Sequence, residues 1–361
     1  MNVEEKNILF LDNAIDLPYQ KRAKILKMFD IDVDLFSSYK DVRQKISTIL
    51  TPKELNSLDK SATKPIEKVL RQYEMDGVTP VTIYSAYYPE LLKEGVEPPF
   101  CLYCKGDINL LKTECMAIVG SRKITEYGKV ATTEFAREFV KANLTVVSGL
   151  AMGVDAIAHS VALENKGNTI AVMAGGFKHI YPQSNYWLYE DICKNGLVVT
   201  EYVPDAEPMA YNFPVRNRII AGLSKGVLVT EAGAKSGALH TKNYAIDSGR
   251  DVFAIPGKIT YPESEGTNNI IKQCQASLVT SPSDIFNALG ISLKEKEENI
   301  TQQLDIMAST ILNYILVEKK TFQEIADFTK LSTRELNNKL LEMQMEGLII
   351  KLAGNSYISC K

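Results

Sequence analysis

Short apolar runs alternate with amphipathic segments through the middle of the chain, between residues 78 and 290. The runs are rich in Val, Ile, Leu and Ala without polar alternation, which indicates strands that are covered on both faces. The first three end in Gly or Ser, and helical patterns follow at residues 127–141 and 154–164. The expected strands are residues 117–121, 144–149, 169–176, 197–201, 227–230, 251–255 and 277–280. This pattern predicts a doubly wound, mostly parallel α/β domain over residues 78–290.

Residues 1–77 show a helical pattern instead. Apolar positions recur at helical spacing over residues 19–29, 42–50 and 66–73, and Thr51-Pro52 is a favourable helix start. A bundle of short helices of the SAM or helix-hairpin-helix type is expected. No glycine hairpin is present to hold DNA phosphates, and 13 basic residues equal 13 acidic ones up to residue 76. We therefore expect this domain to contact protein or to act as a scaffold.

The C-terminal segment, residues 305–361, follows a Lys- and Glu-rich linker at residues 291–304. A helical pattern covers residues 306–316, a capping box at Thr321 opens a second helix, and Ser332 opens a third. A hairpin turning at Gly354-Asn355 completes the pattern of a winged helix. From residue 301 onward 7 basic residues equal 7 acidic ones. This balance favours protein contact or weak DNA binding over sequence-specific recognition.

The composition of the whole chain is that of an ordinary globular protein, with 45% hydrophobic and 24% charged residues. Of the 21 glycines, 18 lie between Gly95 and Gly290, which supports an α/β centre between two helical units. The net charge of −3 shows that the protein as a whole is not positively charged, but it permits a local basic site. The acidic N-terminus is unlike a signal peptide, and no apolar run approaches the ~20 residues of a membrane helix. We expect a cytoplasmic protein with no membrane partner.

The six cysteines of the 361 residues do not suggest a disulfide framework. Cys101 and Cys104 form the one Cys-x-x-Cys motif, and no second pair stands at zinc-ribbon spacing. The motif lies in an apolar run that resembles a strand. We expect no metal site.

Candidate binding groups follow the expected strands, because ligands of a parallel sheet bind at the carboxyl ends of its strands. Small residues let backbone N–H groups approach an anion closely, and basic side chains add charge. Aromatic residues stand among them in the sequence, as single-stranded nucleic acid requires. The groups at this edge are Ser121, Arg122, Lys123, Gly149, Phe177, Lys178, Tyr181, Tyr211, Phe213, Lys235, Ser236 and Lys242.

The stretch at residues 213–224 places a helix beside that edge. Pro214 suits the first turn of a helix, and Arg216, Asn217 and Arg218 follow it, where free backbone N–H groups attract anions. An isolated Arg-x-Arg of this kind is usually a solvated helix surface. Among the glycine turns it becomes the densest positive charge at the edge, with Asn217 as a contact or as a brace of the turn.

Several enzyme classes lack their signatures in this sequence. The dinucleotide spacing G-x-G-x-x-G and a Walker A motif are both missing, and Ser236 is one position late for a nucleophile elbow. A triad of Ser148, Asp155 and His159 has no specific support. We expect no catalytic residue, no metal and no cofactor.

The assembled motifs resemble those of the DprA/Smf family of bacterial DNA-processing proteins. The resemblance covers residues 117–281, and the helical front and the winged-helix tail agree with the architecture of that family. The matching motifs are Val119-Gly120-Ser121-Arg122, Ser148-Gly149-Leu150-Ala151, Gly153-Val154-Asp155, residues 213–224, Glu231-Ala232, Lys235-Ser236-Gly237, Ala254-Ile255-Pro256-Gly257 and Gly266-Thr267-Asn268-Asn269.

The resemblance implies an extended Rossmann-like core that binds single-stranded DNA without sequence preference and has no catalytic turnover. It also implies a homodimer and a partnership with the RecA recombinase, which the protein helps to load onto incoming strands during natural transformation. Met152 and Gln183 depart from the family, since basic residues are common at both positions. The residues expected at the DNA are Ser121, Arg122, Gly149, Phe177, Lys178, Arg216, Asn217, Arg218, Lys235, Ser236, Lys242 and Asn269.

A nucleotide-binding sensor or a nucleoside monophosphate hydrolase is the alternative, because related Rossmann-like folds bind nucleotides. The Pro-Gly-Gly-x-Gly-Thr turn of such hydrolases is missing here. This alternative is therefore the less favoured one.

Overall fold

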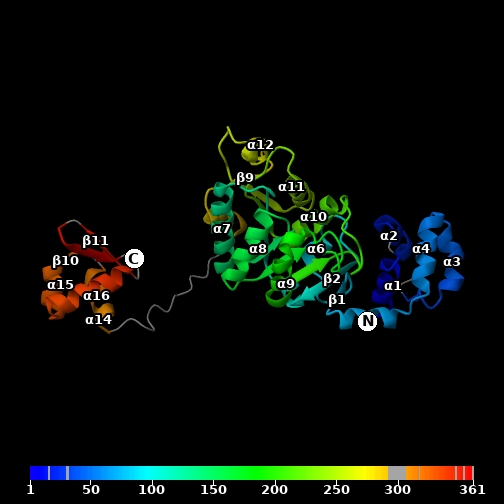
Figure 1. Ribbon diagram of the computed structural model, residues 1–361, viewed down its shortest axis with the longest axis horizontal. Helices are drawn as coiled ribbons and strands as arrows, with labels where there is room; N and C mark the ends of the chain where they lie inside the picture. The colour runs from blue at the N-terminus through cyan, green and yellow to red at the C-terminus, as the bar shows by residue number, and fades with distance from the viewer. Residues whose placement is uncertain are drawn as a thin grey trace. The chain divides into compact units, whose positions relative to one another are not determined.

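The computed structural model describes residues 1–14, 17–29, 32–291, 306–316, 318–345, 348–352 and 354–359. The chain divides into two compact units, Met1–Ser292 and Leu293–Lys361. Each is described by itself (Figure 1). The linker expected at residues 291–304 lies almost wholly outside the described residues.

A sheet in the order β1-β2-β6-β5-β4-β3-β7-β8-β9 forms the centre of the larger unit. The pairs from β6 through β3 to β9 are all parallel, whereas β1 and β2 join antiparallel at one edge. The predicted mostly parallel α/β fold is thus confirmed, with β1 as a strand that the apolar pattern did not reveal. The strands are β1 Thr79–Thr82, β2 Cys101–Gly106, β3 Cys115–Val119, β4 Thr145–Ser148, β5 Thr169–Val172, β6 Leu197–Thr200, β7 Gly226–Val229, β8 Asp251–Ala254 and β9 Ser277–Leu278.

Helices cover both faces of the sheet, which explains why its strands lack polar alternation. Side chains of α6, α10, α11 and α12 pack in the core on one face, and those of α7, α8 and α13 pack on the other. The bounds are α6 Glu90–Lys93, α7 Glu126–Lys141, α8 Val154–Glu164, α9 Tyr186–Asn195, α10 Asn212–Leu223, α11 Ala238–Asp247, α12 Glu265–Lys272 and α13 Pro282–Leu289.

The strand order reverses at β3. From β3 the chain continues to β4 on one side, and it returns later to β7 on the other side. At such a switch point the loops after the two neighbouring strands diverge and leave a crevice at their carboxyl ends. The loops after β3 and β7 therefore flank a natural binding position.

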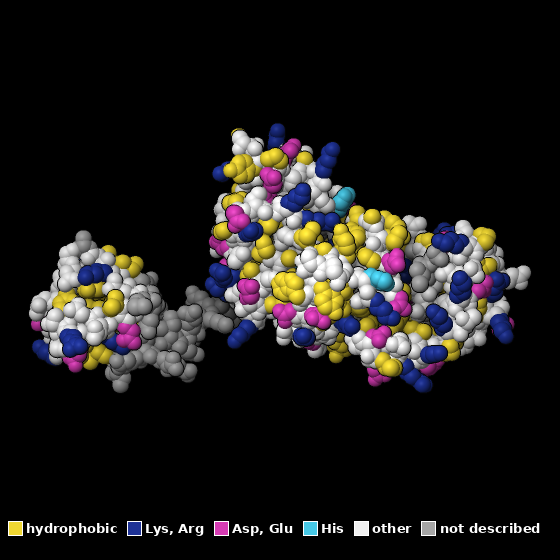
Figure 2. Space-filling view, viewed as in Figure 1, with side chains coloured by type: hydrophobic (Ala, Val, Ile, Leu, Met, Phe, Trp, Pro, Cys, Tyr) yellow, Lys and Arg dark blue, Asp and Glu magenta, His cyan; other side chains and the backbone are white. Residues whose placement is uncertain are grey.

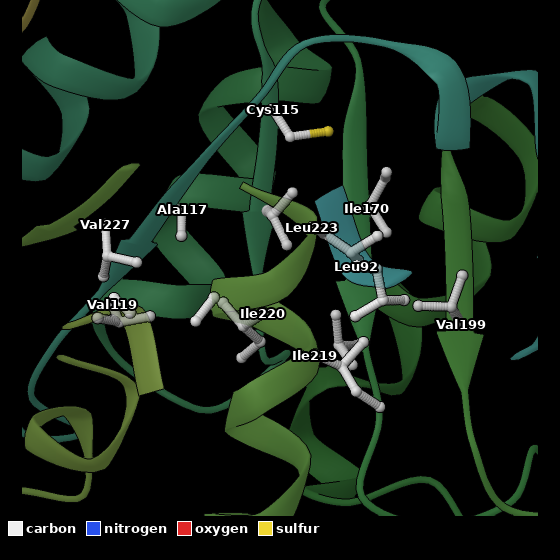
Figure 3. Packing of buried hydrophobic residues seen from close by; sticks show 14 of the residues in the cluster. Leu92, Cys115, Ala117, Val119, Ile170, Val199, Ile219, Ile220, Leu223 and Val227 are labelled. Carbon is white, nitrogen blue, oxygen red and sulfur yellow. The ribbon is translucent and has the colours of Figure 1, made fainter. Parts of the chain in front are cut away.

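Helix α10 is anchored over this part of the sheet (Figure 3). Ile219, Ile220 and Leu223 are buried against strand residues that include Val119 and Val199. The helix begins at Asn212, two residues earlier than Pro214 suggested. Arg216 and Arg218 therefore lie beyond the first turn, on a part of the helix that is largely buried.

The N-terminal helices pack on the antiparallel edge of the same sheet. They are α1 Val3–Asp12, α2 Tyr19–Met28, α3 Tyr39–Ser47, α4 Pro52–Ala62 and α5 Ile66–Met75. Ile8 and Leu9 of α1 share a core with Tyr103 of β2, and the rings of Tyr19 and Phe100 stack 4.8 Å apart. The helical region is present as expected, but it joins the sheet in one compact unit, so the boundary at residue 77 stays a prediction.

In its described residues, the smaller unit contains three helices and a three-stranded antiparallel sheet in the order β10-β12-β11. Its elements are α14 Ile306–Ile315, β10 Lys320–Thr321, α15 Phe322–Thr329, α16 Thr333–Met345, β11 Ile349–Leu352 and β12 Ser356–Ser359. This order is that of a winged helix. The short β10, which pairs with β12, is the one strand of this sheet that the sequence pattern did not indicate.

Within the described residues, no helix is both long and apolar enough to cross a membrane, and no His, Cys, Asp and Glu side chains gather into a metal site. Cys101 and Cys104 lie in β2 but belong to core clusters on opposite faces of the sheet. Their side chains therefore cannot share one ion. Burial raises the pKa of both thiols.

Candidate functional site

A pocket of about 770 Å³ opens at the carboxyl ends of β3 and β7. Its walls come mainly from the loops after these two strands, from α10 and from the start of α11. This is the switch-point crevice. It is lined by Val119, Gly120, Ser121, Arg122, Lys123, Ala151, Asp155, Tyr181, Ala210, Phe213, Pro214, Arg216, Asn217, Ile220, Gly233, Lys235, Ser236, Gly237, Ala238, His240 and Thr241.

The loop after β3 is held in place by β7. The Ser121 amide donates to the Glu231 carbonyl at 2.8 Å, and the buried Glu231 carboxylate accepts from the Thr125 amide at 2.9 Å. Both contacts fix the loop, so the exposed Arg122 side chain stands at the mouth of the pocket.

Aromatic rings form one wall beside Arg122. Its guanidinium carbon lies 5.7 Å from the ring centroid of Phe213, and the Tyr181 ring meets Phe213 edge-to-face at 5.3 Å. Tyr181 is 53% exposed. A cation beside one exposed and one partly buried ring suits a ligand that has both anionic and planar groups.

The lining also includes Lys235, Ser236 and Asn217. Lys235 is exposed, and the Asn217 amide nitrogen donates to the Gly237 carbonyl at 3.3 Å, which fixes the loop after β7 against α10. Among the residues that the structure describes, neither Arg122 nor Lys235 has an ion-pair partner. The loop after β3 and the loop after β7 therefore each bring an unpaired positive charge to the pocket.

Arg216 lines the pocket but is 4% exposed, and its guanidinium braces the floor. It donates to the carbonyls of Gly149, at 2.9 Å, and of Val172. Asp155 beneath the same turn accepts from the Gly149 amide at 3.1 Å. Burial lowers the pKa of Arg216 to about 10, against the opposing effect of Asp155, and burial raises the pKa of Asp155.

Gly149 is required by this brace. A Cβ at this position would lie 2.5 Å from Nη2 of Arg216, closer than real contacts allow. Gly149 also lines a small hollow beside the main pocket, together with Met152 and Tyr181. Gly149 therefore lies at the sheet edge as expected, but its role there is structural.

Arg218 departs from the expectation of a phosphate contact. Its side chain is 4% exposed and forms an ion pair with Glu201, which follows β6. It is absent from the pocket lining. A phosphate would have to displace a buried carboxylate to reach it, which the structure disfavours.

Four more expected residues lie outside the lining of this pocket. Phe177 is buried in the core and cannot act as a stacking platform, and Lys242 is buried with its ammonium on Gln275 at 2.8 Å. Lys178 is exposed but pairs with Asp205, and Asn269 is exposed on α12. Phe177 and Asn269 carry no charge, the charge of Lys178 is paired, and Lys242 is buried away from the pocket, so these four residues add little positive charge to it.

His240 and Asp155 line the pocket without having been expected there. His240 stands in the first turn of α11, directly after the small residues that follow β7. This position directly after the small residues is the sequence feature that could have predicted His240 at the pocket. Asp155 follows the Gly153 turn in the same way, on α8.

The imagined triad of Ser148, Asp155 and His159 is not assembled. The Ser148 hydroxyl donates to the Ile118 carbonyl at 2.6 Å, and Nδ1 of His159 faces the Thr169 hydroxyl at 2.6 Å. Burial, with Arg216 as a lesser cause, lowers the pKa of His159 to about 3. With Nδ1 engaged at Thr169 and its basicity lowered this far, the imidazole is a poor general base for the serine.

The fold and the pocket define a Rossmann-like protein with a cationic, aromatic crevice at its switch point. The family model described as DNA recombination-mediator protein A matches residues 79–290. The chain belongs to this family, DprA/Smf, as its motifs suggested.

Relatives and solved structures agree with this assignment. The chain is 40% identical over 225 residues to DNA processing protein DprA of Bacillus subtilis, covering 62% of this chain and 75% of the relative. It is 35% identical over 300 residues to Protein Smf of Escherichia coli, covering 81% and 80%. The X-ray structure of DprA from Streptococcus pneumoniae matches with a TM-score of 0.68 at 35% identity, over 80% of this chain and 98% of that one.

DNA processing protein A from Helicobacter pylori is a second structural relative. It matches with a TM-score of 0.54 at 33% identity, over 59% of this chain and 95% of that one. Its structure concerns a single-stranded DNA binding mode.

Proposed function

We propose that this protein binds single-stranded DNA, without sequence preference, across the carboxyl ends of β3, β4 and β7. The observation that carries the proposal is that Arg122 and Lys235, both exposed and unpaired within the described residues, line one pocket together with Tyr181 and Phe213. The single-stranded DNA binding mode of the Helicobacter pylori relative supports it.

The side chains divide into contacts and supports. Arg122 and Lys235 contact phosphates, and Tyr181 and Phe213 offer faces or edges to bases, which is tolerant of sequence. Ser121, Asn217 and Ser236 supply polar contacts at the same loops. Arg216, Gly149 and Arg218 maintain the shape of the edge from beneath and are not principal phosphate contacts.

The wider role rests on the family. We propose that the protein protects incoming single strands during natural transformation, helps to load the RecA recombinase, and acts as a homodimer without catalytic turnover. The edge strand β9 supports self-association, since Leu278 on it is 52% exposed and an open edge is a ready pairing surface. RecA nucleation on single-stranded DNA, measured with and without this protein, tests the loading role; equal nucleation rates would refute it.

Binding of a fluorescent dT oligonucleotide, followed by anisotropy, tests the central proposal. Arg122→Ala should weaken binding about tenfold, since charge and ring contacts are lost together. Lys141→Ala is the matched control, because Lys141 is an exposed lysine at the far end of α7 that pairs with Glu138. Equal affinities of the two variants would refute the proposal.

A nucleoside monophosphate hydrolysis assay on the same preparation separates the alternative function. We expect no turnover. Hydrolysis that Arg122→Ala abolishes would instead favour the nucleotide enzyme.

A further inference from the structure

The loop between β8 and α12, residues 256–262, exposes an unusual set of side chains. Ile259 is 95% exposed, Tyr261 is 46% exposed and Lys258 is exposed as well. Figure 1 shows the yellow chain projecting next to α12. Figure 2 shows hydrophobic side chains among Lys, Arg, Asp and Glu side chains over the part of the unit that carries α11 and α12.

This loop is braced rather than loosely attached. The Asn268 side chain forms two hydrogen bonds with Gly257, donating to its carbonyl at 3.0 Å and accepting from its amide at 3.1 Å. The Tyr127 hydroxyl donates to the Pro256 carbonyl at 2.8 Å. The base of the loop is thus held from α12 and from α7, while its tip presents an aliphatic side chain to water. Ile259 and Tyr261 are thus presented on the same fixed loop, where both can contact a ligand.

The loop continues the wall of the DNA pocket. The Pro262 carbonyl oxygen lies only 3.3 Å from where a Cβ on Gly233 would stand, and Gly233 lines the pocket two residues before Lys235. The Gly266 amide, at the start of α12, donates to the Ala232 carbonyl at 2.7 Å. A strand leaving the pocket past Lys235 therefore meets this loop next.

A cation and an aromatic ring are combined on the loop. The Lys258 ammonium lies 4.9 Å from the ring centroid of Tyr261. An exposed ring can stack with a base while the neighbouring lysine contacts the phosphate of the same nucleotide. This kind of contact requires no particular sequence.

We propose that residues 256–262 form a second contact for single-stranded DNA, beyond the pocket. A base stacks on Tyr261, Ile259 packs against that base or its neighbour, and Lys258 contacts the phosphate. The proposal rests on the proposed function of the pocket, whose path it extends towards the β9 edge of the sheet. Continuity with the pocket and the positive charge of Lys258 favour nucleic acid over a protein partner.

Affinities for a series of dT oligonucleotides, from about 6 to about 20 nucleotides, test this proposal. Tyr261→Ala should weaken binding of the long oligonucleotides about tenfold and leave the shortest unchanged. Lys258→Ala should lower the salt slope by ~0.7, again only for long strands. Tyr261→Phe should restore the affinity, because the ring face is retained.

Tyr84→Ala is the matched control, since Tyr84 is a comparably exposed tyrosine, at 48%, outside the loop and the pocket lining. Wild-type affinity for long strands in Tyr261→Ala would overturn the proposal, as would an equal loss for short and long strands. A changed sedimentation mass with unchanged DNA binding would assign the loop to a contact between chains, and would overturn it too. Failure of the pocket proposal is distinguishable, because Arg122→Ala would then leave every length unaffected.

Discussion

The ion pair of Arg218 and Glu201 gives the sharpest test of how the binding edge is built. The two side chains are 4% and 10% exposed. Within the described residues, Nε and Nη1 of Arg218 and Oε1 of Glu201 have no hydrogen-bond partner. The pair is therefore buried, with several polar atoms that lack hydrogen-bond partners. Replacing one residue of the pair should therefore affect stability differently from replacing both.

Arg218→Met should be strongly destabilising, because it leaves the Glu201 carboxylate buried without its cation. Removing one partner of a buried pair costs about 3–5 kcal/mol in the free energy of unfolding. With a urea m-value of about 3 kcal/mol per M, the unfolding midpoint should fall by about 1–1.7 M. The double variant Arg218→Met, Glu201→Leu removes both charges and should recover most of this loss, since apolar replacement of a poorly satisfied pair is often neutral or stabilising.

Urea unfolding followed by far-ultraviolet circular dichroism measures these midpoints, and dT anisotropy under native conditions measures the DNA affinity of each variant. The double variant should bind DNA like the wild type. An unchanged midpoint in Arg218→Met would refute the structural role of the pair. A folded double variant that has lost DNA binding would show that Arg218 contacts phosphate after all.

Three further predictions concern the supports and the second unit. Gly149→Ala should lower the free energy of unfolding by about 1–3 kcal/mol in urea melts, because its Cβ would collide with Arg216. His159 has a folded pKa of about 3, below its unfolded value, so its contribution is present above about pH 6.5 and is lost as the pH falls. Between pH 6.5 and 5 the stability of the wild type should therefore fall more steeply than that of His159→Gln, with a difference in slope that rises towards about 1.4 kcal/mol per pH unit. A chain without residues 291–361 should retain most of its affinity for dT in anisotropy, and loss of most of it would show that the smaller unit contributes directly.

The strands and the binding edge were predictable because they depend on local pattern. Buried parallel strands read as continuous apolar runs, and the helix expected at residues 154–164 is α8, Val154–Glu164. The glycine turns at Gly120 and Gly149 then fix where the strands end. A switch-point crevice follows from that order of elements.

The state of individual charges was not predictable, because it depends on partners distant in sequence. Arg218 finds Glu201 17 residues away, and Arg216 finds the carbonyls of Gly149 and Val172, 67 and 44 residues away. Basic residues in a row look alike in the sequence whether they face solvent or a buried carboxylate. Helix α10 also begins earlier than its proline suggested, which moves both arginines off the first turn.

The salt dependence of DNA affinity in the double variant Arg122→Ala, Lys235→Ala tests the central claim most directly. If both side chains contact phosphates across the pocket, the slope of log affinity against log salt should fall by ~1.4, from ~0.7 for each contact with a single strand. The urea midpoint should stay unchanged, because both side chains are exposed. A slope equal to that of the wild type, in a protein that still binds dT, would contradict the claim that this pocket holds the DNA backbone.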